Sequence, residues 1–190
     1  MYKIGQTLYK EKFESSSQAK MQKLGFFFPV VTGKKDANAA VENGKYPFFT
    51  CSKQISAIDE YSFNESAILL AGNGDFNVKF YRGKFDAYQR TYVLIPKDAS
   101  LLGYLYWAIS LNLKNITSNF RGSVIKFITK GNIEDFEIPF IDDRETIYQL
   151  QKCLEKIESN NYENIYLAHL RDTLLPELMN GKIDLSKVEI

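Results

Sequence analysis

The side chains that most often do catalytic chemistry are scarce in this sequence. It has one histidine, His169, and no second metal ligand lies near it, so a solvated position fits it better than a general base or a metal ligand. No Asp-x-Lys or Glu-x-Lys motif occurs, although a magnesium-dependent nuclease usually carries an acidic residue two positions before a lysine. The residues therefore indicate no catalytic constellation, and we expect a protein that is not itself an enzyme.

Phosphate-binding loops and metal sites are not indicated either. The segments Gly72-x-Gly74 and Thr32-Gly33-Lys34 lack the full glycine spacing followed by Lys-Ser/Thr, so both are interpreted as turns. Cys51 and Cys153 lie far apart and form no C-x-x-C motif, which predicts two reduced thiols and no metal site.

The net charge of +1 conceals an uneven distribution. Residues 1–141 contain 18 Lys and Arg against 13 Asp and Glu, whereas residues 142–190 contain 6 against 10. A basic body followed by an acidic segment suggests that an anionic partner would bind the body. Chance is the alternative, because many globular domains carry a net charge of this size.

The acidic C-terminal segment has the pattern of a long amphipathic helix. Its apolar residues first recur at steps of three and four, which is helical spacing. They then resume in a shifted register after a polar run at residues 159–161. The residues that predict an apolar stripe for a dimer or helix interface are Ile147, Leu150, Leu154, Ile157, Ile165, Leu170 and Leu174.

The ends of this helix can also be predicted. Asp142 followed by Glu145 fits an N-terminus near residue 142, because carboxylates accept hydrogen bonds from the first backbone amides. We expect the helix to continue through residues 159–161, Pro176 to disrupt it, and Asn180-Gly181 to end it. From 142 to about 175 such a helix is on the order of 50 Å long, and its exposed apolar stripe requires a partner.

The preceding residues predict a β-rich body. Residues 1–20 predict a short helical arm that ends in a flexible joint of serines at 15–17. Strands are predicted at 24–31, as an edge or bulged strand, and at 44–52, 67–71, 76–81, 88–95 and 124–128. Turns are predicted at 72–75 and 82–84, a core helix carrying Trp107 at 101–113, and a helical turn at 133–136 before extended residues 138–140.

These elements predict an α+β protein of one globular domain and a long C-terminal helix. A stretch of 18 or more apolar residues is lacking, and the charged N-terminal residues do not resemble a secretory signal. We therefore expect a cytoplasmic protein without a membrane partner.

Several stretches resemble the specificity subunit of type I restriction-modification systems. Residues 23–35 and 43–52 resemble the opening blocks of the family's target recognition domain, and residues 67–80 with 92–94 resemble its middle. Residues 122–128 with 138–140 are similar to its closing block, and residues 170–186 are close to the family's usual C-terminus. Residues 8–13 resemble what precedes the second recognition domain in complete subunits.

The resemblance implies a non-catalytic protein that recognises double-stranded DNA for partner subunits. It implies a target recognition domain at residues 21–141 and a conserved long helix with its tail at 142–190, which would serve dimerisation and partner docking. A modification subunit, and a restriction subunit where one exists, would be the protein partners. S-adenosylmethionine, ATP and magnesium would belong to those partners, and this chain would bind no cofactor.

Length is the departure from the family pattern, because complete subunits carry two recognition domains and two long helices. The chain has room for one of each, so it is either a half-subunit that pairs as a homodimer or a truncated fragment. An antiparallel homodimer would cover the apolar stripe and predicts a bipartite, palindromic DNA target with adenine methylation by the partner. The alternative function is a coiled-coil adaptor without DNA recognition of its own.

Candidate DNA-binding residues follow from the chemistry of DNA contacts. Basic side chains bind phosphates, and Asn, Gln, Arg, Ser or Thr on loops can bond base edges. An ordinary exposed position is the alternative for each of them. The candidates are Lys34, Lys35, Lys45, Lys53, Asn73, Asn77, Arg82, Lys84, Gln89, Arg90, Arg121, Ser123 and Lys126.

Overall fold

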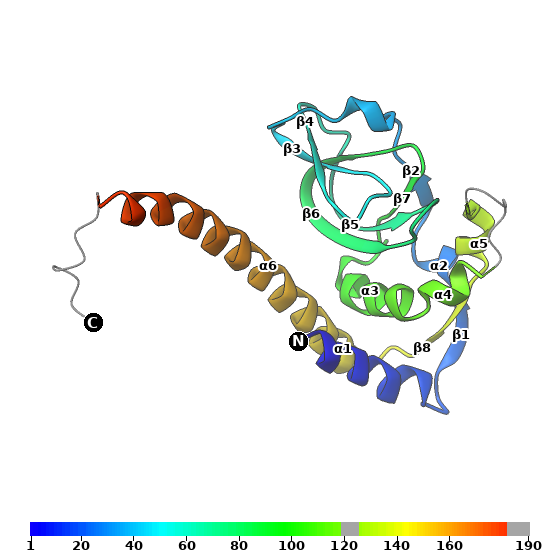
Figure 1. Ribbon diagram of the computed structural model, residues 1–190. Coiled ribbons are helices and arrows are strands. Elements are labelled where there is room, and N and C mark those ends of the chain that lie inside the picture. Colours follow the sequence, from blue (N-terminus) through cyan, green and yellow to red (C-terminus); the bar gives the residue numbers. More distant parts are fainter. Residues whose placement is uncertain (119–125, 182–190) are drawn as a thin grey trace, which may run out of the picture.

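The computed structural model describes residues 1–118 and 126–181. These residues form an α+β fold from which one long helix extends, as the sequence predicts (Figure 1). The helices are α1 (Tyr2–Tyr9), η1 (Lys10–Glu14), α2 (Leu24–Phe27), η2 (Ala37–Ala39), η3 (Ala99–Leu101), α3 (Leu102–Leu111), α4 (Leu113–Ile116), α5 (Lys130–Glu134) and α6 (Arg144–Met179). The strands are β1 (Lys20–Lys23), β2 (Val30–Thr32), β3 (Tyr46–Phe49), β4 (Ser56–Ile58), β5 (Phe63–Ala71), β6 (Val78–Ala87), β7 (Thr91–Leu94) and β8 (Glu137–Phe140).

The described strands form one six-stranded and one two-stranded sheet. The larger sheet has the order β2-β7-β5-β6-β3-β4 and is antiparallel except where β3 runs parallel to β6. The sheet curls strongly, so that Lys35, after the edge strand β2, pairs with Tyr88, after β6 (Figure 1). The smaller sheet joins β1 to β8 and thereby links the beginning of the body to its end.

The predicted strand at residues 24–31 is only partly correct. Leu24 and Phe27 are both buried, and their spacing of three suits the short helix α2 better than a strand. Phe28 is extended because the following Pro29 disfavours the helical conformation at the residue before it. Only Val30–Thr32 forms a strand, and it lies at the edge of the sheet as expected.

The predicted turn at residues 82–84 is wrong, because β6 runs through it. Eight residues of β6 pair with β5, from Val78 to Phe85, and Gly83 continues the strand at a φ of +122°. A glycine tolerates this backbone conformation, so the strand bends there without ending. The chain turns instead at residues 88–90, between β6 and β7. The strands predicted at 44–52 and 67–71 are present as β3 and β5.

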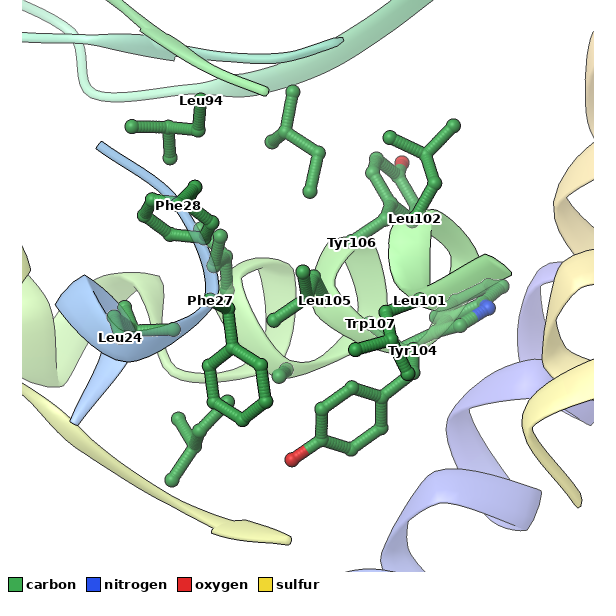
Figure 2. Close-up of a cluster of buried hydrophobic side chains, with 14 of the residues drawn as sticks. Leu24, Phe27, Phe28, Leu94, Leu101, Leu102, Tyr104, Leu105, Tyr106 and Trp107 are labelled. Carbon is green, nitrogen blue, oxygen red and sulfur yellow. The ribbon is translucent and has the colours of Figure 1, made fainter. Parts of the chain in front are cut away.

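The helix α3 lies at the centre of the main core. Residues 102–109 are all buried, because the sheet packs on one side of the helix and α1 and α6 pack on the other. Figure 2 shows Leu94 of the sheet above α3 and Leu24, Phe27 and Phe28 beside it. The prediction of a core helix carrying Trp107 is confirmed, and each large apolar side chain buried here contributes about 1.5–3 kcal/mol.

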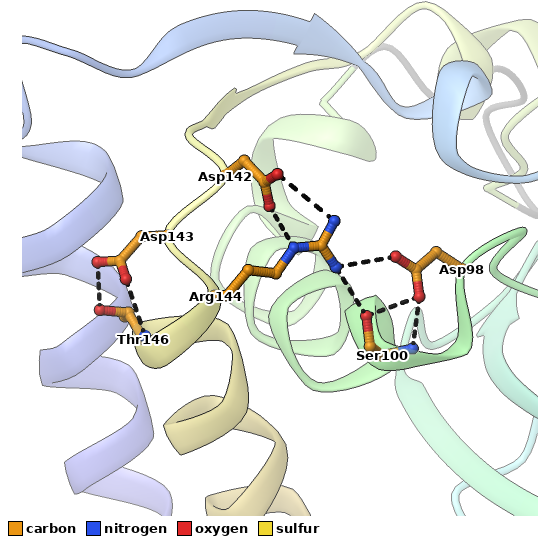
Figure 3. A network of polar contacts seen from close by, with 6 residues as sticks. All are labelled: Asp98, Ser100, Asp142, Asp143, Arg144 and Thr146. Atoms are coloured by element: carbon orange, nitrogen blue, oxygen red, sulfur yellow. Dashed lines mark hydrogen bonds and ion pairs between the residues drawn. The ribbon is translucent and has the colours of Figure 1, made fainter.

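The long helix α6 begins one residue later than predicted. Asp143 is its N-cap and accepts hydrogen bonds from the Thr146 amide at 3.1 Å and the Thr146 hydroxyl at 2.6 Å (Figure 3). Asp142 bonds the Arg144 guanidinium instead, and Arg144 also bonds Asp98, which precedes α3. Because its carboxylate accepts these amide and hydroxyl bonds, Asp143 and not Asp142 starts the helix.

The helix α6 is continuous over 36 residues, so the predicted continuation through residues 159–161 is confirmed. Contrary to expectation, Pro176 does not disrupt the helix: a proline removes only its own backbone donor, and the Asn180 amide still bonds the Pro176 carbonyl at 3.0 Å. The predicted end holds, with Asn180 as C-cap and Gly181 at a φ of +67°. Among the described helices, none is both long and apolar enough to cross a membrane.

The predicted interface stripe on α6 divides into two halves. Ile147, Leu150 and Leu154 are buried in the core of their own chain against α1 and α3, and Ile157 packs at its edge. They therefore form a helix interface, but with helices of their own chain, and they are not available to a second copy because the helical arm with buried Tyr9 and Phe13 belongs to the same core. The distal residues Ile165, Leu170 and Leu174 are exposed.

Candidate nucleic-acid interface

Five chain segments meet at one end of the curled sheet. Backbone hydrogen bonds hold them together: the Gln89 amide donates to the Lys35 carbonyl, the Tyr88 amide to the Phe49 carbonyl, and the Gly72 amide to the Arg90 carbonyl, each at 2.9 Å. The thiol of Cys51 also donates to the Arg90 carbonyl at 3.4 Å. We call this surface the loop face, and it comprises residues 32–36, 50–54, 72–79, 88–92 and 126–128.

The segment 126–128 is fixed on the turn that follows β5. The Gly74 amide donates to the Lys126 carbonyl and the Ile128 amide to the Gly72 carbonyl, both at 3.0 Å. The Tyr92 hydroxyl donates to the Ile128 carbonyl at 2.9 Å, and burial raises the pKa of that hydroxyl. Of the strand predicted at 124–128, residues 126–128 form an isolated pairing, and residues 124 and 125 lie outside the described residues.

A half-buried lysine, Lys79, supports the loop face. The Lys79 ammonium donates to the Ser52 carbonyl and to the Asn77 side-chain oxygen, both at 2.6 Å, and burial lowers its pKa. The Asn77 amide group in turn donates to the Cys51 carbonyl at 2.8 Å. The sequence analysis missed Lys79. It lies two positions after the candidate Asn77 in the strand predicted at 76–81, and residues two apart on a strand share one side of the sheet.

A shallow hollow lies in the loop face. Its volume is about 340 Å³, and its lining includes Gly72, Gln89, Arg90, Tyr92, Phe127 and Ile128. Phe127 is exposed for 37% of its surface and presents an apolar ring beside polar side chains. This combination suits contact with a partner that has both polar and apolar edges.

The charge of the body is concentrated on the loop face. Its segments carry six cationic residues, Lys34, Lys35, Lys53, Lys79, Arg90 and Lys126, against two carboxylates, Asp36 and Asp75. The net charge of this surface therefore accounts for most of the positive excess of residues 1–141. Such a surface attracts polyanions. Residues 1–118 and 126–181 contain no cluster of His, Cys, Asp or Glu suited to a metal ion.

A family model described as the type I restriction modification DNA specificity domain matches residues 17–167. The chain belongs to this family. The match confirms, over most of the chain, the resemblance to type I specificity subunits that the sequence shows.

Similar proteins include curated and structurally solved specificity subunits. The EcoDI specificity subunit of Escherichia coli is 43% identical over 171 residues, which cover 86% of this chain and 38% of that protein. The MjaIX specificity subunit of Methanocaldococcus jannaschii is 24% identical, over 86% of this chain and 44% of that protein. This chain therefore spans less than half the length of these two relatives.

Solved structures show the same fold. The S subunit of a type I restriction-modification system from M. genitalium aligns with a TM-score of 0.73 at 17% identity, over 86% of this chain and 46% of that chain. The HsdS subunit from Thermoanaerobacter tengcongensis aligns with a TM-score of 0.53 at 15% identity, over 96% of this chain and 51% of that chain. The predicted fold class is thus shared with specificity subunits.

The structure places eight of the predicted DNA-binding residues together on the loop face. The loop face contains Lys34, Lys35, Lys53, Asn73, Asn77, Gln89, Arg90 and Lys126. Arg121 and Ser123 lie outside the described residues.

Three predicted DNA-binding residues lie elsewhere. Lys45 precedes β3, at the end of that strand opposite the loop face, and Lys84 lies over the Tyr61 ring with its ammonium 4.8 Å from the ring centre. The Arg82 side chain points to α6, where its guanidinium lies 3.6 Å from the Glu155 carboxylate. It was predicted as a loop residue because a turn was expected at 82–84, but a strand position directs it onto the helix.

Proposed function

We propose that this chain is the DNA-recognition component of a type I restriction-modification system and binds double-stranded DNA through its loop face. The convergence of five segments on one basic surface carries the proposal, because it brings phosphate-binding cations beside side chains able to bond base edges. The membership in the specificity family supports it independently.

The chain itself would perform no catalysis. It would act in the cytoplasm and direct a modification subunit, and a restriction subunit where one is present, to a bipartite target. S-adenosylmethionine, ATP and magnesium would be bound by those subunits, and adenine methylation at the target would be the product of the complex. The printed names of the relatives, which are specificity subunits of type I restriction enzymes, support this assignment.

Pairing of two copies would supply two recognition domains. The distal half of α6 supports this step, because its apolar residues Ile165, Leu167, Leu170, Leu174, Leu175 and Met179 are exposed and need a cover. At about 1.5 Å per residue, 36 residues span about 54 Å, which accommodates half-sites one DNA turn, roughly 34 Å, apart. The alternative to pairing of two copies is that this chain is a fragment of a longer specificity subunit.

Co-expression with the modification subunit tests the proposal. Adenine methylation at one bipartite sequence is expected in cells carrying the wild-type chain, and none with the triple variant Lys34→Ala, Lys53→Ala, Arg90→Ala. The double variant Lys45→Ala, Lys84→Ala, outside the loop face, is the matched control and should preserve the mark. A soluble complex that methylates no specific sequence would refute the proposed function.

A coiled-coil adaptor that only associates with proteins is the second candidate. The exposed apolar half of α6 favours it, since such a surface suffices for protein binding without any DNA contact. In that case the triple variant and the wild-type chain would bind duplex DNA equally weakly, while the complex with the modification subunit would still form.

A further inference from the structure

Side-chain partners divide the candidate residues of the loop face into two groups. Lys35 is paired with Glu60 at 3.0 Å, and Asn77 is held by Lys79 and the Cys51 carbonyl. These side chains are engaged in fixing the loops. By contrast, within the described part of the chain the side chains of Lys34, Lys53, Asn73, Gln89 and Arg90 have no hydrogen-bond or ion-pair partner.

Gln89 and Arg90 combine uncommitted side chains with a fixed backbone. Their turn is held from three sides, by the Lys35 carbonyl, by the Gly72 amide and by the Cys51 thiol. The Thr91 amide also bonds the Tyr88 carbonyl across the turn at 2.8 Å. Because the backbone is already ordered, binding does not have to order the loop as well as the two side chains, and such preorganisation favours precise recognition.

We propose that this turn recognises bases directly, with Arg90 bound to a guanine and Gln89 to a neighbouring adenine in the major groove. A guanidinium presents two parallel donors that match the O6 and N7 acceptors of guanine, and a glutamine amide matches N6 and N7 of adenine. Both side chains border the hollow of the loop face beside Phe127, which offers space for base edges next to them. This inference rests on the proposed function.

The lysines on either side of the turn complete the arrangement. Lys34 adjoins Lys35, whose carbonyl accepts from Gln89, and Lys53 follows the Cys51 segment that bonds Arg90. They flank the turn on its two sides and bind phosphates, which position the duplex without distinguishing its sequence.

Selection from a random duplex library tests the inference, with the full-length chain and its variants as probes. The wild-type chain should enrich a half-site that contains a guanine next to an adenine. Arg90→Ala should lose about 10- to 100-fold of the preference for that guanine, and Gln89→Ala should lose preference only at the adenine. Lys34→Ala should weaken binding to all sequences alike and reduce the salt dependence of the affinity.

A charge-preserving variant separates recognition from simple attraction. Arg90→Lys keeps the positive charge but not the rigid pair of parallel donors, so it should weaken the guanine preference less than Arg90→Ala does and retain the salt dependence. Lys45→Ala is the matched control, and its selected sequence should equal that of the wild type. Trp107 fluorescence confirms that each variant is folded, because that ring is fully buried.

The outcomes distinguish the two proposals. If Arg90→Ala binds and selects the wild-type sequence, the turn does not recognise the guanine, and the inference is wrong while DNA recognition by the loop face stands. If the wild-type chain itself binds no duplex and selects no sequence, the proposed function fails.

Discussion

The guanidinium of Arg82, on strand β6, lies 3.6 Å from the carboxylate of Glu155 on helix α6. It also lies 3.8 Å from the Glu158 carboxylate, and the three side chains are only 20–33% exposed. These two ion pairs join β6, in the sheet that carries the loop face, to α6, the helix that would separate the two recognition domains of the proposed dimer. Arg82 therefore contributes to the orientation of the sheet on the helix and does not reach the loop face.

The coupling between Arg82 and Glu155 can be measured in a double-mutant cycle. Arg82→Ala and Glu155→Ala should each destabilise the chain, and the pair should show a coupling energy of about 0.2–1 kcal/mol, because partial exposure screens the attraction. Chemical denaturation provides the free energies of unfolding. Fully additive effects would show that the contact contributes nothing to stability.

The buried half of α6 should be required for folding. Leu150 is fully buried against its own chain, so Leu150→Ala should lower the free energy of unfolding by about 2–5 kcal/mol. Ile165→Ala, at a site that is 67% exposed, is the matched control and should stay within about 0.5 kcal/mol of the wild type when both are measured at a protein concentration low enough to dissociate the proposed dimer. A Leu150 variant as stable as the control would place the core elsewhere.

The exposed half of α6 should determine association instead. The double variant Ile165→Asp, Leu170→Asp should convert the proposed dimer to a monomer while leaving thermal stability at low protein concentration unchanged, since neither side chain is in the core. Light scattering measures the mass. The control is the exposed polar pair Asn164→Asp, Thr173→Asp on the same helix half, and a dimer that survives the apolar substitutions would place the interface outside this stripe.

The N-cap of α6 should make stability depend on acid pH. Hydrogen bonds from the Thr146 side chain and amide lower the pKa of Asp143, so the folded state binds this proton more weakly than the unfolded state. The stabilisation is complete above the unfolded pKa of about 3.9 and is lost as the pH falls through the lower folded value.

Thermal melts at about pH 5 and about pH 3 test this dependence. Asp143→Asn keeps a capping oxygen but cannot titrate, so its melting temperature should fall less over this interval than that of the wild type. Asp143→Ala should lose about 0.5–2 kcal/mol at neutral pH. Equal acid sensitivity of wild type and Asp143→Asn would exclude Asp143 as the titrating group.

The crossing of α3 and α6 should not tolerate a side chain at Gly103. A methyl group there would lie 2.6 Å from the Gln151 Cα, and the Gly103 amide donates to the Gln151 side-chain oxygen at 2.9 Å. Gly103→Ala should therefore destabilise the chain by about 1–3 kcal/mol, measured by denaturation with Trp107 fluorescence. Gly131→Ala in α5, where an added methyl group meets only ordinary contacts, should not destabilise, and equal effects of the two variants would contradict the close crossing.

Elements whose patterns lie within a short stretch of sequence could be predicted from the sequence alone. Helical spacing predicted a C-terminal helix that continues through residues 159–161, and apolar content predicted the core position of Trp107. The family resemblance was also visible in the sequence alone. Several of the basic and amide residues predicted near turns lie on the loop face, because turns at one end of a sheet meet in space.

Which side chains are available for binding depends on the packing of the whole chain. Periodicity revealed an apolar stripe on α6 but not that α1 and α3 of the same chain cover its first half, because that requires long-range packing. A glycine in a strand and a glycine in a turn look alike in sequence, so Arg82 was predicted in a loop although β6 directs it onto Glu155. Likewise, the partners of Lys35 and Asn77, and the lack of partners for Gln89 and Arg90 among the described residues, depend on contacts between segments distant in sequence.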